Sequence, residues 1–152
     1  MSHLMDTMIA FFEEDEWPYT IVEEGSVLGI VFQGQHGQWT CYAQAREPQQ
    51  QFVFYSVCPV NAPQSKRNAM LSFLTRANYG LVIGNFEMDL DDGEIRYKTS
   101  IDVEGTELIA PLMKPVVYAN VMMMDQYLPG IMSIIYSDVS PEQAIAQVEG
   151  QG

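Results

Sequence analysis

Carboxylates alternate with apolar residues from Glu87 to Asp91, and an Asp-Gly pair closes the run at residue 93. Oxygen ligands at this spacing could hold a calcium ion, but an EF-hand loop requires glycine at its sixth position and a bidentate glutamate at its twelfth. Counted from Glu87, those positions hold Asp92 and Lys98, and counting from Asp89 fits no better. We therefore interpret this stretch as a turn and not as a metal site.

Histidine and cysteine, the usual residues of zinc sites and of nucleophilic catalysis, are scarce. The chain has two of each: His3, His36, Cys41 and Cys58. No Cys-x-x-Cys or His-x-x-x-His spacing gathers zinc ligands. His36 and Cys41 could act as a base and a nucleophile, but their odd spacing would direct them to opposite faces of a strand, and no third group orients them. The sequence therefore predicts no catalytic site, no metal site and no cofactor.

Cys41 and Cys58 belong to two neighbouring predicted strands, 38–46 and 51–58. If the turn is symmetric about residues 48–51, the cysteines are directly opposed, with Cα atoms about 4.5 to 5.5 Å apart, within reach of a disulfide. A redox switch is one interpretation; two reduced thiols in the core is the one we favour. Because two cysteines make no disulfide framework and the chain opens without a basic signal segment, we expect a cytoplasmic protein.

Net charge is the most unusual property of the composition. Seven lysines and arginines against twenty aspartates and glutamates give a charge of −13. Binding to nucleic acid requires clustered cations, which this chain lacks, and an anionic membrane surface repels it. We therefore expect neither nucleic acid nor a membrane as a partner. A protein partner with a basic surface fits the charge better.

Four consecutive acids, Glu13, Glu14, Asp15 and Glu16, end a segment whose apolar spacing predicts a helix over 3–15, which Ser2 can cap. Acids are unfavourable at a helix C-terminus, where the dipole prefers cations by about 0.3 to 1 kcal/mol each. One interpretation is a solvated, fraying helix end. The other is an acidic dock for a basic segment of a partner.

Changes in apolar periodicity divide the chain into helical and extended segments, and its length is that of a single domain, 1–152. The predicted elements are a helix over 3–15, strands over 19–22, 27–33, 38–46 and 51–58, a helix over 64–79 ended by Gly80, a hairpin over 81–103, and helices over 108–136 and 141–148. This order predicts an α+β fold, α-β(3 or 4)-α-β(2)-α, with an antiparallel sheet and helices packed on it.

The Asp92-Gly93 pair predicts a two-residue hairpin tip, because both residues tolerate the positive φ that such a turn needs. In that register the numbers of paired residues sum to 185. Glu87 then faces Lys98, and Asp89 faces Arg96, while apolar residues pair on the other face. The charge pattern and the apolar pattern thus favour the same register.

The predicted helix over 108–136 has one apolar half, the natural core face. Three consecutive methionines cannot all lie on it, and Met122 points almost opposite its centre, close to Tyr118 and Val121. We predict that Tyr118, Val121 and Met122 contribute to a dimer or partner interface. The alternative is that another element of the chain covers them. Pro129 and the following glycine should break or kink the end of this helix.

The central part of the chain resembles the core signature of a known family. The residues that carry the resemblance are Arg76-Ala77-Asn78-Tyr79-Gly80-Leu81, Gly84-Asn85-Phe86-Glu87, Asp92-Gly93-Glu94-Ile95-Arg96-Tyr97-Lys98 and, later, Asp125-Gln126-Tyr127-Leu128-Pro129. On these residues the chain, over about 4–137, is similar to the YbjN-like bacterial domain family. The resemblance implies a fold like that of type III secretion chaperones, often dimeric, with no catalytic residues. The acid run at 13–16 departs from the family pattern.

Three classes of function remain for comparison. The sequence favours a non-catalytic chaperone-like or adaptor domain that binds another protein and forms a homodimer. A regulatory or sensory domain is the alternative, and a closed apolar pocket with a few convergent polar groups would favour it. A small cytosolic enzyme is the third, but it requires clustered titratable groups in a cleft, which the sequence does not assemble.

Overall fold

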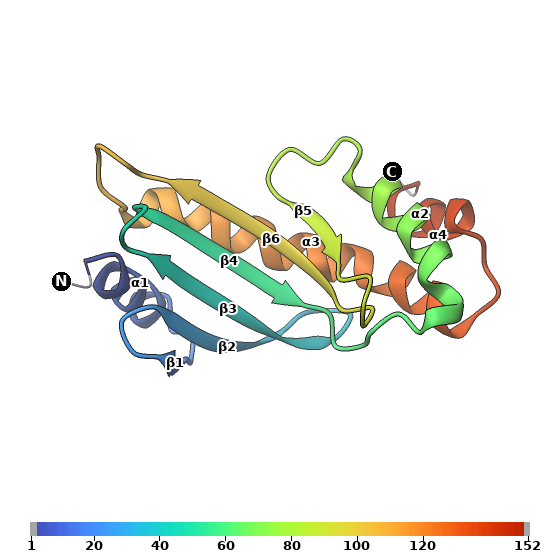
Figure 1. The fold of residues 1–152 in the computed structure, drawn as a ribbon, viewed down its shortest axis with the longest axis horizontal. Helices are drawn as coiled ribbons and strands as arrows, with labels where there is room; N and C mark the ends of the chain where they lie inside the picture. The colour runs from blue at the N-terminus through green and yellow to red at the C-terminus, as the bar shows by residue number, and fades with distance from the viewer. Residues whose placement is uncertain (1–2, 151–152) are drawn as a thin grey trace.

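The computed structural model describes residues 3–150, in which four α-helices, one 3-10 turn and six strands form an α+β fold (Figure 1). The helices are α1 (His3–Glu14), α2 (Arg67–Asn78), α3 (Ala110–Tyr136) and α4 (Pro141–Glu149), and the 3-10 turn η1 (Gln64–Lys66) precedes α2. The strands are β1 (Thr20–Glu23), β2 (Val27–Gln33), β3 (Gln38–Arg46), β4 (Gln51–Val57), β5 (Asn85–Met88) and β6 (Ile95–Asp102). The predicted order is confirmed, with four strands before α2 and two after it.

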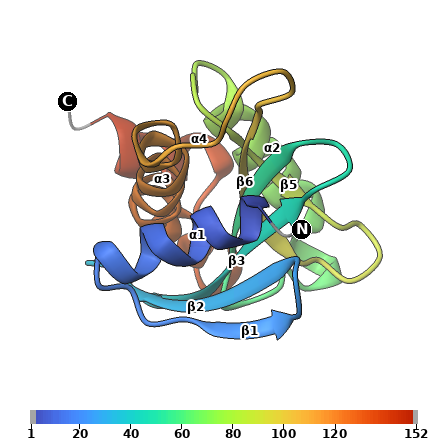
Figure 2. The same cartoon turned by 90° about the vertical axis from the view of Figure 1, so that its left-hand side faces the viewer.

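The six strands form one antiparallel sheet in the order β1-β2-β3-β4-β6-β5. Along β3 every second residue is buried, beginning at Trp39, and the residues between them are partly exposed. This alternation arises because only one face of the sheet is covered. Figure 2 shows α1 and α3 on that face, and the two helices are in contact. In Figure 1 the opposite face of the sheet is turned to the viewer and carries no helix.

The end of α1 is closed by a tight cap. Glu16 has a positive φ of 61°, at the position where glycine is usual, and the Trp17 N–H donates to the Phe12 carbonyl at 2.8 Å. The rings of Phe12 and Trp17 pack with centroids 5.6 Å apart, the apolar contact that accompanies such caps. This cap fixes the direction in which the chain leaves α1. At the other end of the helix, the predicted cap residue Ser2 lies outside the described residues.

The long helix α3 continues through Pro129 to Tyr136, so it does not break where the sequence predicted. Gly130 is buried, and a Cβ there would lie 2.5 Å from the ring of Phe73. Because Gly130 has no side chain, α2 can pack closely against α3. Packing on both sides of α3 keeps it helical at Pro129. Within residues 3–150, neither α3 nor any other helix combines the length and apolarity needed to cross a bilayer.

A buried polar cluster fixes the middle of α3 to the sheet. The amide nitrogen of Asn120 lies 2.9 Å from the Phe54 carbonyl and 3.0 Å from the Tyr97 carbonyl. It also lies 3.1 Å from the Thr99 hydroxyl, which donates to the Val116 carbonyl at 2.8 Å. Because unpaired buried polar groups cost stability, the contacts of the Asn120 nitrogen favour one register of the helix on the sheet. The side-chain oxygen of Asn120 is buried without a hydrogen-bond partner among the described residues.

The register of the β5–β6 hairpin differs from the predicted one by two residues. Phe86 pairs with Tyr97 and Glu87 with Arg96, so partner numbers sum to 183 and not to 185. A shift of two residues keeps every side chain on its predicted face but changes its partner. Glu87 therefore opposes Arg96, yet it still forms an ion pair with Lys98 at 3.1 Å.

The shift arises because the tip is a four-residue loop, 90–93, and not a two-residue turn. Asp89 stands opposite Glu94 instead of the predicted arginine, with its N–H donating to the Glu94 carbonyl at 2.9 Å. Gly93 has a φ of 80°, and its carbonyl accepts a hydrogen bond from the Ala62 N–H at 2.8 Å. A Cβ on Gly93 would lie 2.1 Å from the Ala62 oxygen. The loop has four residues because its backbone packs against the backbone of Ala62, which is distant in the sequence.

Cys41 and Cys58 are buried free thiols, but they are not directly opposed. Cys41 pairs with Ser56, since partner numbers of β3 and β4 sum to 97 and not to the predicted 99. Burial raises the pKa of Cys41 to about 12 and that of Cys58 to about 11. Both groups are therefore protonated at neutral pH, as expected of core thiols.

The last helix begins as predicted, with a capping box. The Ser140 hydroxyl accepts from the Gln143 N–H at 3.1 Å, and the Gln143 side chain accepts from the Ser140 N–H at 2.9 Å. Ala144 is fully buried, and α4 packs on both α2 and α3. The short C-terminal helix therefore belongs to the same packed unit as the rest of the described chain.

Candidate protein-binding grooves

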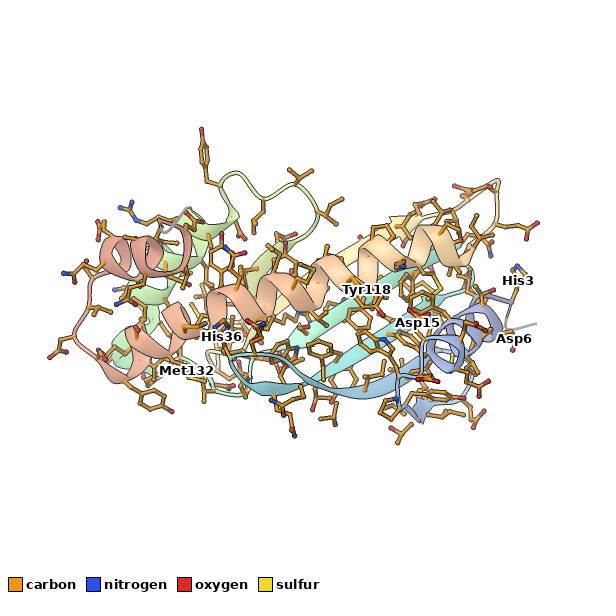
Figure 3. The ribbon with its side chains drawn as sticks, turned by 180° about the vertical axis from the view of Figure 1, so that it is seen from behind. His3, Asp6, Asp15, His36, Tyr118 and Met132 are labelled. Carbon is orange, nitrogen blue, oxygen red and sulfur yellow. The ribbon has the colours of Figure 1, made fainter. Side chains whose placement is uncertain are left out.

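An open groove of about 820 Å³ lies between α1 and the start of α3, and we call it the acid-rimmed groove. The residues that line it are His3, Asp6, Thr7, Ala10, Phe11, Glu14, Asp15, Leu108, Ile109, Ala110, Pro111 and Lys114. Positions 3, 7, 10 and 14 recur at three- and four-residue spacing, so they share one face of α1. Figure 3 shows His3, Asp6 and Asp15 on the α1 side, beside the first half of α3.

The floor of the acid-rimmed groove is apolar, and its rim carries the carboxylates of three acids against one cation, Lys114. Phe11 and Leu108 are buried beneath it, whereas Ile109 is 47% exposed and offers an accessible apolar side chain. Asp6 and Glu14 are exposed on the rim. An apolar floor with an acidic rim suits a segment that carries both apolar and basic side chains.

The structure divides the predicted acidic dock. Glu14 and Asp15 line the acid-rimmed groove. Glu13 instead accepts a hydrogen bond from a tyrosine hydroxyl at 2.7 Å, and Glu16 is exposed in the cap that ends α1. Asp6, two helical turns before Glu14, joins the rim. This role of Asp6 was not predicted, because Asp6 lies outside the acid run and reaches the rim through helical spacing.

A chain of hydrogen bonds holds Asp15 from the side of the core. The Trp17 ring N–H donates to the Tyr118 hydroxyl at 3.1 Å, and that hydroxyl donates to the Asp15 carboxylate at 2.9 Å. Figure 3 labels Tyr118 and Asp15, which lie near each other. Burial raises the pKa of Tyr118 above its ordinary value, and the Asp15 carboxylate adds to the rise, while the Trp17 hydrogen bond opposes it. Tyr118 is therefore a neutral donor that orients the Asp15 carboxylate.

A second groove, of about 910 Å³, lies where the β2–β3 turn, α3 and α4 meet, and we call it the Met122 groove. Asp125 on α3 holds the turn in place. Its carboxylate accepts from the Gln35 N–H at 3.1 Å and from the His36 N–H at 2.8 Å. The His36 ring nitrogen Nδ1 lies 2.9 Å from the Asp125 carbonyl oxygen. Both oxygens of the Asp125 carboxylate are therefore hydrogen-bonded to the turn, and these bonds hold the turn where it lines the groove.

The three residues of the predicted α3 interface do not form one exposed stripe. Met122 is 61% exposed and lines the Met122 groove. Val121 is 1% exposed, and Tyr118 is half-buried and hydrogen-bonded within the chain. The expected exposure of Val121 is wrong, and that of Tyr118 is reduced, because α3 packs against the sheet, α1, α2 and α4 together. Met122 alone keeps the exposure that an interface residue needs.

The residues considered for metal binding or nucleophilic catalysis are not gathered at one site among residues 3–150. Within residues 3–150, no three His, Cys, Asp or Glu side chains form a group that could hold a metal ion. His36 is exposed on the β2–β3 turn, whereas Cys41 is buried with its sulfur 3.5 Å from the Ser56 hydroxyl. The nucleophile and the base considered from the sequence therefore occupy different environments.

Comparison with known proteins places this arrangement in a family. The family model YbjN, described as "Putative bacterial sensory transduction regulator", matches residues 5–131. No protein with a curated description matches the chain. Several chains of solved structures are similar to it. One is that of YbjN, "a putative transcription regulator from E. coli", with 12% identity, a TM-score of 0.59 and coverage of 86% of this chain and 88% of that chain.

Another similar structure is that of the HopA1-SchA chaperone-effector complex, with 12% identity, a TM-score of 0.54 and coverage of 83% of this chain and 93% of that chain. At such identity both likenesses concern the fold alone, and they confirm the expected chaperone-like α+β architecture. The family match spans most of the chain and includes the residues at 76–98 on which the resemblance rested. The chain therefore belongs to the YbjN family.

Proposed function

We propose that this protein is a non-catalytic, chaperone-like adaptor that holds a basic, partly apolar segment of a partner protein in the acid-rimmed groove. One observation carries the proposal: the exposed apolar Ile109 and the carboxylates of Asp6, Glu14 and Asp15 line the same groove. The net charge of −13 attracts basic segments over a longer range and raises their rate of encounter.

Two further observations support this role. The HopA1-SchA structure is a complex of a chaperone with an effector, and the present fold is similar to it. Because folds host many functions, the groove and not the fold identifies the binding segment. We also propose that this adaptor is a single domain, residues 1–152, of the cytoplasm, because two buried free thiols fit a reducing compartment.

A sensory, ligand-binding role is the alternative that the family description raises. Such a role favours a closed apolar pocket that buries most of a small molecule. The acid-rimmed groove and the Met122 groove are both open at the surface. Open grooves suit an extended or helical segment of another protein better than a small ligand.

The proposal is tested by fluorescence anisotropy with a labelled, designed helical peptide that carries leucine on one face and lysine beside it. The full chain should bind this peptide, with an affinity that falls as salt is added. A matched peptide with glutamate in place of every lysine should not bind. Equal binding of the two peptides would contradict an acidic groove.

Variants of the chain locate the binding. Ile109→Ser removes the exposed apolar floor, and the double variant Asp6→Asn, Glu14→Gln removes two rim charges. Each lost charge should weaken binding by about two- to fivefold, the range of exposed ion pairs. Glu23→Gln with Glu24→Gln is the matched control, because both glutamates are exposed and lie outside the groove. If the control weakens binding as much as the rim variant, net charge and not the groove binds the peptide.

A further inference from the structure

The face of α1 that lines the acid-rimmed groove carries one carboxylate towards each end and small side chains between them. Asp6 and Glu14 are exposed, and both line the groove. Thr7 and Ala10 lie between them on the same face. Because a helix rises 1.5 Å per residue, the two acids are about 12 Å apart along the helix axis. The groove therefore offers two carboxylate positions about two helical turns apart, with little side-chain bulk between them.

The charges of the groove are free to bind a partner. Within residues 3–150, neither Asp6 nor Glu14 takes part in an ion pair. Lys114, on the α3 side of the groove, is also without an ion pair in this part of the chain. A binding segment can thus engage these three charges without first breaking an internal contact.

The backbone of α1 favours a helix over a strand as the bound segment. A strand binds best to a row of free N–H and C=O groups, but the interior of a helix pairs these groups with one another. A strand in the groove would therefore bury backbone groups without partners, whereas a helix arrives with its own groups paired. The small side chains of Thr7 and Ala10 also permit the close approach of a second helix.

We propose that the segment bound in the acid-rimmed groove is a helix with two basic residues seven or eight positions apart and apolar residues between them. This inference rests on the proposed function and specifies the partner. Basic residues at that spacing are about 10.5 to 12 Å apart along a helix, which matches the distance from Asp6 to Glu14. Apolar residues at the third and fourth positions after the first basic residue reach the exposed Ile109 across Ala10.

Lys114 makes the groove selective for this pattern and not for positive charge alone. It lines the α3 side, whereas Asp6 and Glu14 line the α1 side. A helix that is basic on every face would place a cation against Lys114, and like charges in contact oppose binding. The bound helix therefore has its two basic residues towards α1 and a neutral or acidic residue towards α3.

Fluorescence anisotropy with three labelled helical peptides of identical composition tests the spacing. The central leucines stay in place, and the two lysines are four, seven or eleven positions apart. The full chain should bind the seven-spaced peptide about two- to fivefold more tightly than either of the others, because only this peptide reaches both carboxylates. Circular dichroism establishes that the peptides are equally helical.

A charge exchange tests which residues pair. Asp6→Lys should weaken binding of the seven-spaced peptide, and replacing the lysine at one end of the peptide by glutamate should restore it. Glu14→Lys should be restored only by the same replacement at the other end. Glu23→Lys is the matched control, because Glu23 is exposed outside the groove and the change in net charge is the same, and neither peptide should restore its binding. Thermal melts establish that each variant is folded.

The outcomes separate this inference from the proposed function. Equal binding at all three spacings, or restoration of Asp6→Lys by both exchanged peptides or by neither, would overturn the paired spacing while a basic segment still binds. Tightest binding at four positions would indicate a strand, which spans the same distance at about 3.3 Å per residue, and would overturn the helix. If none of the lysine peptides binds, the proposed function itself is wrong.

Discussion

The two ends of the molecule share one sheet and one long helix, yet their surfaces differ in charge. At the α1 end, Asp6 and Glu14 stand exposed beside an apolar floor. At the α2 end, the loop between α2 and β5, which we call the 79–84 loop, exposes Tyr79 and Val82 in a stretch without acids. Figure 1 shows α1 and α2 at opposite ends of the longest dimension. The exposed acids are thus distributed unevenly, which favours the α1 end for a basic partner.

The element that both ends share is α3. Its first half packs against α1 and the sheet, and its second half packs against α2 and α4. Asn120 lies between the two halves and is hydrogen-bonded to β4 and β6. The predictions below alter first this shared support and then each end in turn.

The largest effect is expected from Asn120→Ala, which removes the donor shared by the Phe54 and Tyr97 carbonyls. Leaving buried acceptors without that donor should lower the free energy of unfolding by about 2 to 3 kcal/mol. Both ends should be destabilised together, in one urea transition. Ser133→Ala on the same helix loses only an exposed hydrogen bond and should change stability by less than about 0.5 kcal/mol. A similar loss in both variants would contradict the role of Asn120 as the central support.

A smaller loss is expected from Gly130→Ala at the α2 end. Alanine normally favours a helix over glycine by about 1 kcal/mol. Here its methyl group would overlap the ring of the buried Phe73, which should lower stability by about 1 to 3 kcal/mol. Adding Phe73→Leu in the same chain should recover part of the loss that the glycine variant causes. Denaturant unfolding measures both effects, and a more stable Gly130→Ala variant would show that α2 does not constrain α3.

The uneven charge predicts how stability responds to salt. The thermal midpoint should rise as salt is added, because screening weakens repulsion among the acids near Glu13, Glu14 and Glu16. Neutralising Glu14 and Glu16 together should raise the midpoint at low salt and reduce the salt response. Neutralising Glu142, which pairs with Arg76 at 2.9 Å, should not. Thermal melts at two ionic strengths measure this, and a midpoint that falls with salt would mean that attractive pairs dominate.

The smallest expected effect concerns acid pH. Burial alone would raise the pKa of Glu87, but hydrogen bonds from Arg96 and Lys98 outweigh it and hold this pKa below its ordinary value. Such a carboxylate stabilises the fold above its unfolded pKa, and the contribution is lost as the pH falls through the folded pKa. Melts from pH 7 to about pH 3 should therefore show a steeper acid loss in the wild type than in Glu87→Gln. Parallel curves would contradict an ion-paired Glu87.

Local patterns were enough to predict most elements, whereas contacts between distant segments were not. The capping box at Ser140 and the strand limits of 27–33 and 38–46 follow from neighbouring residues, and the structure has them there. Both hairpin registers were wrong by two residues, because loop length depends on more than the turn residues. At the β5–β6 tip, Gly93 packs on Ala62, a contact that no local pattern indicates.

The candidate site, too, could be predicted where it depends on neighbouring residues but not where it depends on distant contacts. The acid run at 13–16 pointed to one side of the acid-rimmed groove, since Glu14 and Asp15 line it. Its floor depends on how the start of α3 meets α1, which periodicity cannot predict. The same limit explains Val121, because a helical wheel assumes one buried face, whereas α3 is packed on several.

The central claim is that a basic, apolar segment binds at the α1 end and not at the α2 end. The most direct test is a titration of ¹⁵N-labelled full chain with the lysine–leucine peptide, followed by amide chemical shifts. The account predicts that shifts concentrate in α1 and at residues 108–114, while the 79–84 loop is unaffected. Shifts concentrated in the 79–84 loop or around Met122, with α1 unchanged, would contradict it.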